Sequence, residues 1–329
     1  MQKRRVILAI ATAVALGQAS VFSLAHAQKA TFPSKPIRMI VPFAPGGVSD
    51  TSARIVAEKM SQHLGQSVVV ENKPGASGNI GAQQVAQSEP DGYTILLGFD
   101  GTLVINPHLQ KVPFDPVKSF APIGKIGDAS LIIVVNPKIP VKNFTELLAY
   151  ARTQPGGLSY GSAGTGSTPH LAGESLKQRT GIPLTHIPYK GGGQAMSDVV
   201  GGSLPMLFTA VAGAYGFVKN KQVQAVGVSG AARVTSLPEV PTLTESGVDD
   251  FVFDSWTGLL APAGTPRPII DTLNHALNAS LTAADTKARL ADLGIAATPG
   301  SPEDYAHQIR NDLQKNKSIV EAAKIAAQP

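Results

Sequence analysis

The chain has 329 residues, with 28 Lys and Arg against 23 Asp and Glu, and it contains no cysteine. The missing cysteine excludes disulfides, thiolate metal ligands, a cysteine nucleophile and a lipid-modified N-terminal cysteine. The formal charge is +5, but Lys3, Arg4 and Arg5 lie at the N-terminus and leave only +2 for the rest of the chain. A net charge this small argues against a nucleic-acid partner, which needs a clustered basic face.

The N-terminus has the three parts of a secretory signal peptide. The basic residues 3–5 precede an apolar run over 6–24, and Ala25-His26-Ala27 forms a small-x-small cleavage signature. We therefore interpret residues 1–27 as a signal peptide cleaved after Ala27 and expect a periplasmic protein. No later apolar stretch approaches the roughly 18 residues that a membrane span requires.

Short apolar runs then alternate with glycine-rich turns and amphipathic helices, which predicts α/β units with parallel strands. Ala53 to Leu64 form a helical stripe that ends at Gly65, and Asn143 with Glu146 has the spacing of a capping box. Another helical stripe covers 269–281. The expected strands lie, in chain order, at 37–41, 68–70, 94–97, 131–135, 158–160, 184–187, 204–208 and 223–228.

Two series of such units predict two lobes. We assign residues 28–125 and 229–329 to the first lobe and residues 126–228 to a second lobe inserted between them. The chain then crosses between the lobes twice, and the two crossing segments are expected to form a hinge. A ligand cleft is expected between the lobes, because ligands bind where the carboxyl ends of parallel strands meet helix N-termini.

The turns at these strand ends have the composition of an anion site. A helix N-terminus presents free N–H groups and the positive end of a dipole, and glycine allows the backbone to approach a ligand closely. A single glycine-rich turn is ordinary connection chemistry, whereas several that converge on one cleft favour ligand binding. Each hydrogen bond to a charged ligand contributes roughly 1.5–3 kcal/mol, so four to six neutral donors hold an anion without arginine.

Enzyme motifs are missing from the sequence. The segment Ser162 to Gly166 resembles a phosphate loop but lacks the following Gly-Lys-Ser/Thr, and no dinucleotide-binding turn occurs. The histidines show no metal-ligand spacing. His170 follows a candidate turn, and Asp50 is interpreted as a helix-start residue rather than a catalytic acid. We expect no enzyme activity, no cofactor and no bound metal.

Six segments carry a resemblance to a known family. They are KPIRMIVPFAPGGVSD (35–50), VENKPGASGNIGA (70–82), YGSAGTGSTPHLAGE (160–174), HIPYKGGGQAMSDVVGG (186–202), SLPEVPTLTESGV (236–248) and SWTGLLAPAGTP (255–266). In this order they closely resemble the Bug family, the extracytoplasmic receptors of tripartite tricarboxylate transporters. The resemblance implies a two-lobed periplasmic-binding-protein fold of type II character, in which each lobe has a mostly parallel sheet flanked by helices.

The same resemblance implies a set of ligand-binding residues. They are Phe43, Ala44, Gly46 and Gly47 in the first lobe, and Ser162, Gly164, Thr165, Gly166, Ser167, Tyr189, Gly191 and Thr209 in the second. Many family members have aspartate where this chain has Thr209, and such an acid can pair with the ammonium group of an amino acid. The resemblance therefore argues against an amino-acid ligand, unless Asp50, Asp100 or Asp198 takes the place of the missing acid.

These observations predict a monomeric receptor that closes on a small carboxylate and delivers it to the integral membrane components of a tripartite tricarboxylate-type transporter. We expect a dicarboxylate, aliphatic or aromatic, since Phe43, Phe99, Tyr160 and Tyr189 could stack on a ring such as that of terephthalate. Two alternatives stay open: a periplasmic hydrolase that acts on a carboxylate-bearing substrate, and a structural or partner-binding protein.

Overall fold

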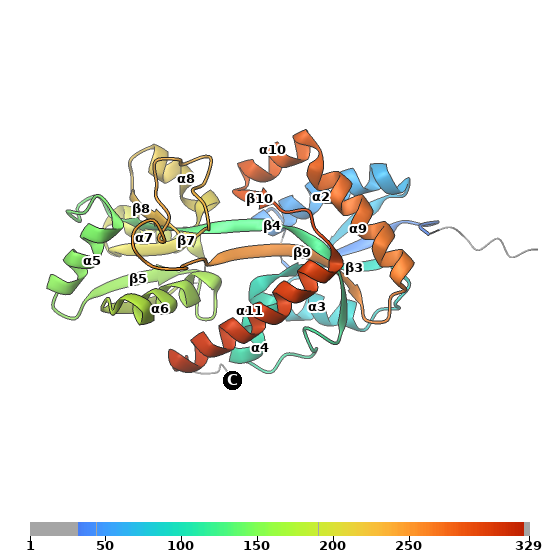
Figure 1. Cartoon of the computed structure of the whole chain (residues 1–329), viewed down its shortest axis with the longest axis horizontal. Helices are drawn as coiled ribbons and strands as arrows, with labels where there is room; N and C mark the ends of the chain where they lie inside the picture. The colour runs from blue at the N-terminus through green and yellow to red at the C-terminus, as the bar shows by residue number, and fades with distance from the viewer. Residues whose placement is uncertain (1–31, 44, 190, 326–329) are drawn as a thin grey trace, which may run out of the picture.

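The computed structural model describes residues 32–43, 45–189 and 191–325 (Figure 1). The expected signal peptide and the candidate ligand residue Ala44 lie outside the described residues. The described chain folds into two lobes, each with its own sheet and helices, and the two are arranged end to end.

The first lobe is built on strands in the order β2-β1-β3-β9-β4. These are β1 (Ile37–Val41), β2 (Val68–Asn72), β3 (Thr94–Phe99), β9 (Asp254–Pro262) and the first part of β4 (Phe120–Val135), with the short β10 (Ile295–Ala297) paired to β4. Side chains alternate between the two faces of a strand. Ile37 and Met39 of β1 therefore pack with α2 (Val48–Leu64) and α9 (Arg267–Thr282), whereas Ile40 packs on the opposite face, with α3 (Asn79–Ala86).

The second lobe uses the end of β4, from Leu131 to Val135, together with four further strands. They are β7 (Met206–Ala210), β5 (Leu158–Ser162), β6 (Leu184–Pro188) and β8 (Gln224–Val228), and β8 pairs with β4 on the side away from β7. The surrounding helices are α5 (Phe144–Thr153), α6 (Thr168–Thr180), α7 (Gly192–Gly201) and α8 (Val211–Lys219). Asn143 caps α5 as the sequence predicts, with its side chain accepting from the Glu146 N–H at 2.9 Å.

Both sheets are mixed rather than purely parallel. The β1–β2, β1–β3, β5–β6 and β5–β7 pairs are parallel, but β4 runs antiparallel to β7, β8, β9 and β10. The sequence pattern predicted only the second half of β4 and did not predict β9. Pro122 and Gly124 interrupt the apolar pattern of the first half of β4, and the strand shifts register between them.

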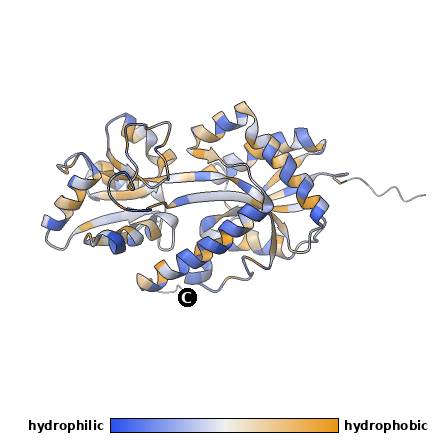
Figure 2. Cartoon of the chain, in the orientation of Figure 1, coloured by the Kyte–Doolittle hydropathy of each residue, from blue (hydrophilic) through white to orange (hydrophobic). Residues whose placement is uncertain are grey.

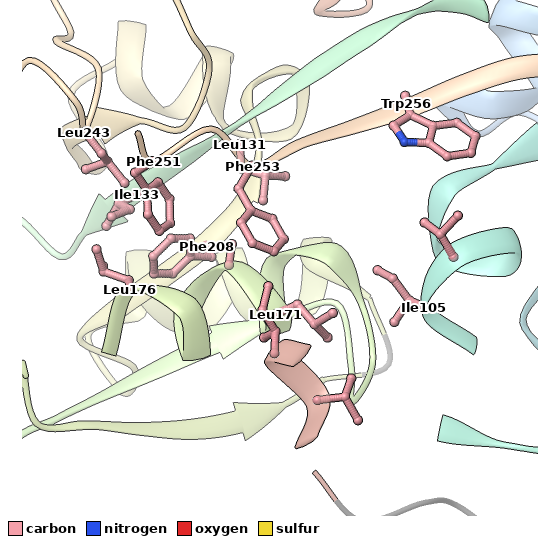
Figure 3. Packing of buried hydrophobic residues seen from close by; sticks show 14 of the residues in the cluster. Ile105, Leu131, Ile133, Leu171, Leu176, Phe208, Leu243, Phe251, Phe253 and Trp256 are labelled. Carbon is pink, nitrogen blue, oxygen red and sulfur yellow. The ribbon is translucent and has the colours of Figure 1, made fainter. Parts of the chain in front are cut away.

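β4 passes through both lobes as one continuous strand, and after the segment 229–253 the chain returns to the first lobe along β9, beside β4 (Figure 1). Phe251 and Phe253, near the end of that segment, pack against the same cluster as Phe208 of β7 (Figure 3). Leu243 joins this cluster too, so much of the segment after residue 229 packs against the second lobe. The division of the chain at residues 126 and 229 stays a prediction.

The C-terminal helix α11 (Pro302–Ala322) lies across the hinge, where it contacts β4, α6 and a π-helical turn, η3 (Gly101–Ile105). The Trp256 indole N–H of β9 donates to Asp312 of α11 at 2.7 Å. Hydrophilic residues alternate with hydrophobic ones along α11 (Figure 2), as expected for a helix with one buried face. The elements not yet named are the 3₁₀ turn η2 (Ala76–Gly78), α4 (Asn106–Leu109) and α10 (Ala284–Asp292).

None of the helices in the described part of the chain combines the length and the hydropathy that a membrane span requires.

Candidate functional site

A cavity of about 580 Å³ lies between the two lobes. Its volume is within the range of small-molecule sites, which is about 300–1,000 Å³. Phe43, Phe99 and Gly101 line it from the first lobe, and Thr165 and Thr209 line it from the second. The cavity is therefore placed where the ligand cleft was expected.

Four helices of more than one or two turns in the described chain begin at this cavity. They are α2, α6, α7 and α8, whose N-cap residues are Gly47, Ser167, Gly191 and Ala210. First-turn residues of each helix line the wall: Val48 and Ser49 of α2, Thr168 and Pro169 of α6, Gly192 of α7 and Ala212 of α8. Their N-terminal N–H groups and positive dipole ends create a favourable environment for an anion.

The described lining residues include no charged side chain. The polar side chains of this described lining are all neutral, namely Ser49, Ser77, Asn106, Thr165, Ser167, Thr168, Thr209, Ser255 and Thr257. The Thr257 hydroxyl is buried without a hydrogen-bond partner among the described residues. A buried polar atom without a partner costs free energy, so this hydroxyl is an unfavourable feature of the described arrangement.

A second part of the wall is apolar. Leu131, Trp256, Leu293 and Ile295 line the cavity, together with the Phe43 and Phe99 rings. These two rings meet edge to face, with centroids 5.3 Å apart and an interplanar angle of 84°. Trp256, which the sequence favoured as a core residue, is both buried and part of the wall. This wall can contact the hydrocarbon or aromatic body of a ligand.

The residues expected from the sequence separate into two groups. Those that line the cavity are Phe43, Thr165, Gly166, Ser167, Gly191 and Thr209. Those that do not line it are Gly46, Gly47, Ser162, Gly164 and Tyr189, and Ala44 is not described. The Tyr189 hydroxyl donates instead to Asp198 Oδ2 at 2.7 Å. Of the four aromatic residues considered for stacking, only Phe43 and Phe99 are in position.

In the first lobe, Asp50 shapes the turn that leads into α2. Its carboxylate accepts hydrogen bonds from the Gly46 N–H at 2.9 Å, from the Arg54 guanidinium at 3.0 Å and from the Asn72 amide at 2.8 Å. Burial raises the pKa of Asp50, but the bonds from Arg54, Gly46 and Asn72 outweigh it and bring the pKa to about 2. Asp50 is thus an ionised structural residue, in agreement with the helix-start interpretation.

In the second lobe, a buried network holds the turn before α6. Ser162 Oγ lies 2.7 Å from His186 Nε2, and the Gly166 N–H donates to His170 Nδ1 at 3.0 Å. The two imidazoles stack with centroids 3.7 Å apart. Burial lowers the pKa of both histidines to about 4, so both rings are neutral near pH 7. Below them, the Tyr160 hydroxyl donates to Glu174 at 3.0 Å.

This network restricts which N–H groups a ligand can reach. The N–H groups of Gly46, Gly164 and Gly166 already donate within the protein, to Asp50, Ser162 and His170. In contrast, the N–H groups of Thr165, Thr168 and Gly192 have no hydrogen-bond partner among the described residues. The glycines expected to donate to a ligand therefore shape the turns, and their neighbours present the free donors.

Several lining residues were not predicted from the sequence. Ser77 and Asn106 reach the cavity from η2 and α4, while Ser255 and Thr257 come from β9. Ser255 and Thr257 belong to the segment SWTGLLAPAGTP, whose resemblance to the family could have indicated them. Nothing in the local sequence pattern indicated that Ser77 or Asn106 would line the cavity. Among the described residues, no group of three or more His, Asp or Glu is arranged to hold a metal ion.

Comparisons with known proteins were made for the whole chain. The family model for the tripartite tricarboxylate transporter family receptor matches residues 52–325. A relative from Pseudomonas sp. (strain P51), the UPF0065 protein in the tcbD-tcbE intergenic region, is 38% identical over 322 residues, covering 97% of this chain and 94% of the relative.

Solved structures agree with that match. The periplasmic binding protein BugD is 36% identical, with a TM-score of 0.76, over 90% of this chain and 100% of that one. The R. palustris protein Rpa4515 with adipate is 32% identical, with a TM-score of 0.79, over 90% and 99% of the two chains. MatC from Rhodopseudomonas palustris with bound malate is 30% identical, with a TM-score of 0.74, over 88% and 100%.

Proposed function

The chain belongs to the tripartite tricarboxylate transporter receptor family, and we propose that it captures a small dicarboxylate, aliphatic or aromatic, and delivers it to the membrane components of such a transporter. The expected fold, a two-lobed periplasmic binding protein, is shared with the relatives of known structure. Export to the periplasm with cleavage after Ala27 and a monomeric state are parts of this proposal.

The main support for this proposal is that four helix N-termini face a cavity whose described lining has no charged side chain. Because α2 belongs to the first lobe and α6, α7 and α8 belong to the second, the donors lie on opposite walls. Each wall can hold one carboxylate, and the apolar residues between them can contact the body of the ligand. The relatives solved with adipate and with malate have dicarboxylates bound, which supports this ligand class.

The described lining of the cavity contains no acidic side chain, which argues against an amino acid as the ligand. Asp50, Asp100 and Asp198 were the acids that could replace the aspartate missing at Thr209, but none of the three lines the cavity. Each accepts hydrogen bonds from protein groups instead. An ammonium group buried without an ionic partner would cost several kcal/mol.

Among the described residues, the hydrolase alternative lacks a hydroxyl that lines the cavity and is paired with a histidine base. Ser162 and His186 are close enough to act as a nucleophile and its base. However, Ser162 is fully buried, and neither residue lines the cavity. We therefore infer that the pair holds the turn and does no chemistry on a bound carboxylate.

Matched ligand pairs test the proposal. Succinate is compared with aspartate and glutarate with glutamate by thermal shift and calorimetry, alongside adipate, terephthalate and benzoate. We expect the amine-free member of each pair to bind tighter and a dicarboxylate to bind tighter than a monocarboxylate. Tighter binding of the amino acids would refute the ligand class, and release of product from any bound compound would favour the hydrolase.

A further inference from the structure

A buried carboxylate joins the two lobes at the base of the cavity. Asp100 follows β3 in the first lobe, and only 3% of its surface is exposed. Its Oδ2 accepts a hydrogen bond from the Thr168 hydroxyl at 2.6 Å, and its Oδ1 accepts one from the Ser255 hydroxyl at 2.7 Å. Thr168 is the first residue of α6 in the second lobe, so the first of these bonds crosses between the lobes.

The two hydrogen bonds of Asp100 connect three segments that line the cavity. Thr168 and Ser255 line it, and so does Gly101, the residue after Asp100. When the lobes separate, β3 and β9 stay together as paired strands of one sheet, so the Ser255 bond can persist. The Thr168 bond cannot, because α6 moves with the second lobe.

Two apolar contacts between the lobes accompany this hydrogen bond. Gly166, in the turn before α6, leaves no room for a Cβ beside the Leu109 side chain of the first lobe. On another side of the cavity, a Cβ at Gly294 would lie 3.2 Å from Ala212 Cβ of α8. The described arrangement is therefore one in which the lobes touch at two places beside the cavity.

We propose that Asp100 acts as an interlobe latch, which favours closure by accepting the Thr168 hydroxyl. This inference rests on the proposed function only in that closure would retain a ligand. Asp100 forms no ion pair with a described residue, so its buried carboxylate is stabilised by hydrogen bonds from hydroxyl and backbone N–H donors. Burial raises its pKa to about 6, against the effect of the bonds from Thr168 and Ser255. Thr168 is a donor to this buried carboxylate only when the lobes are closed, whereas Ser255 can donate in both arrangements, so removing the Thr168 hydroxyl disfavours the closed arrangement.

The latch can be tested without any carboxylate ligand. The chain has no cysteine, so Gln62→Cys on α2 and Ala149→Cys on α5, both at exposed positions, provide a single pair of spin labels across the lobes. Thr168→Val removes the hydroxyl and keeps the shape, whereas Thr168→Ser keeps the hydroxyl. Ser255→Ala removes a donor from the same carboxylate without breaking a contact between the lobes.

Pulsed electron resonance then gives the distribution of distances between the labels. We expect Thr168→Val to shift the ratio of closed to open molecules by about tenfold toward open. Thr168→Ser and Ser255→Ala should keep the distribution of the parent protein. Circular dichroism checks that each variant is folded.

Equal distributions for the Val and Ser variants at position 168 would overturn the latch, and so would an opening in Ser255→Ala as large as in Thr168→Val. Because these measurements contain no ligand, they are independent of whether the parent protein binds dicarboxylates, which calorimetry decides separately.

Discussion

A negative charge placed at the start of α2 should strongly weaken ligand binding without harming the fold. Gly47 is the N-cap of α2, has an extended backbone and has open space where a Cβ would lie. An Asp at this position can accept the free N–H groups of the first turn, which stabilises a helix by a few tenths of a kcal/mol relative to Gly. The same N–H groups are the proposed donors to a ligand carboxylate.

The loss of affinity follows from the repulsion between the two carboxylates. At a separation of about 5 Å and an effective dielectric constant of about 20, two like charges repel by about 3 kcal/mol. This corresponds to a loss of affinity of about 150-fold. Gly47→Asn is the matched control, since its amide competes for the same N–H groups without a charge and should weaken binding less than about tenfold.

Calorimetry with the tightest-binding dicarboxylate measures both affinities, and thermal unfolding followed by circular dichroism measures stability. Normal affinity in Gly47→Asp, or equal losses in the Asp and Asn variants, would refute the argument that α2 binds an anion. Gly166→Asp would be a poorer test of the second lobe. Gly166 has φ at +77°, and the Leu109 Cδ1 atom lies where its Cβ would be, so the substitution strains the turn and displaces the Leu109 side chain.

Three further predictions concern specificity, pH and processing. Thr209→Asp should weaken dicarboxylate binding and strengthen binding of the matching amino acid, which competition calorimetry measures; unchanged preference would show that position 209 does not select the ligand. The pKa of His170 and that of His186 are lowered to about 4 in the folded protein. The free energy of unfolding should therefore be constant above about pH 6.5 and fall as the pH is lowered from about 6.5 to 4. Asp100, whose pKa is raised to about 6, opposes this fall below about pH 6. Urea unfolding across this pH range should show a smaller fall in unfolding free energy for His170→Asn than for the parent protein. An equal fall would refute the claim that the lowered pKa of His170 contributes to this pH dependence. The exported protein should begin at Gln28, and an intact mass that retains residues 1–27 would contradict this.

The sequence alone predicted most of the strands, the two-lobed architecture and the family. A short apolar run that ends at a glycine indicates a buried strand or helix from the pattern of neighbouring residues alone. The strand at 37–41 and the αL glycine that ends α2 at Gly65 were therefore recognised correctly. β9 was not, because its pairing with β3 and β4 involves strands more than a hundred residues away.

The function of the individual glycines was decided by tertiary structure. The sequence marks the turns at Gly46 and Gly166 as anion sites, but it does not show that Asp50 and His170 already accept their N–H groups. The hydrogen-bond partners of a turn come from strands and helices that fold against it, and short-range patterns do not encode those contacts. For the same reason, Ser77 and Ser255 became visible as wall residues, and Asp100 as a link between the lobes, only when the two sheets were brought together around the cavity.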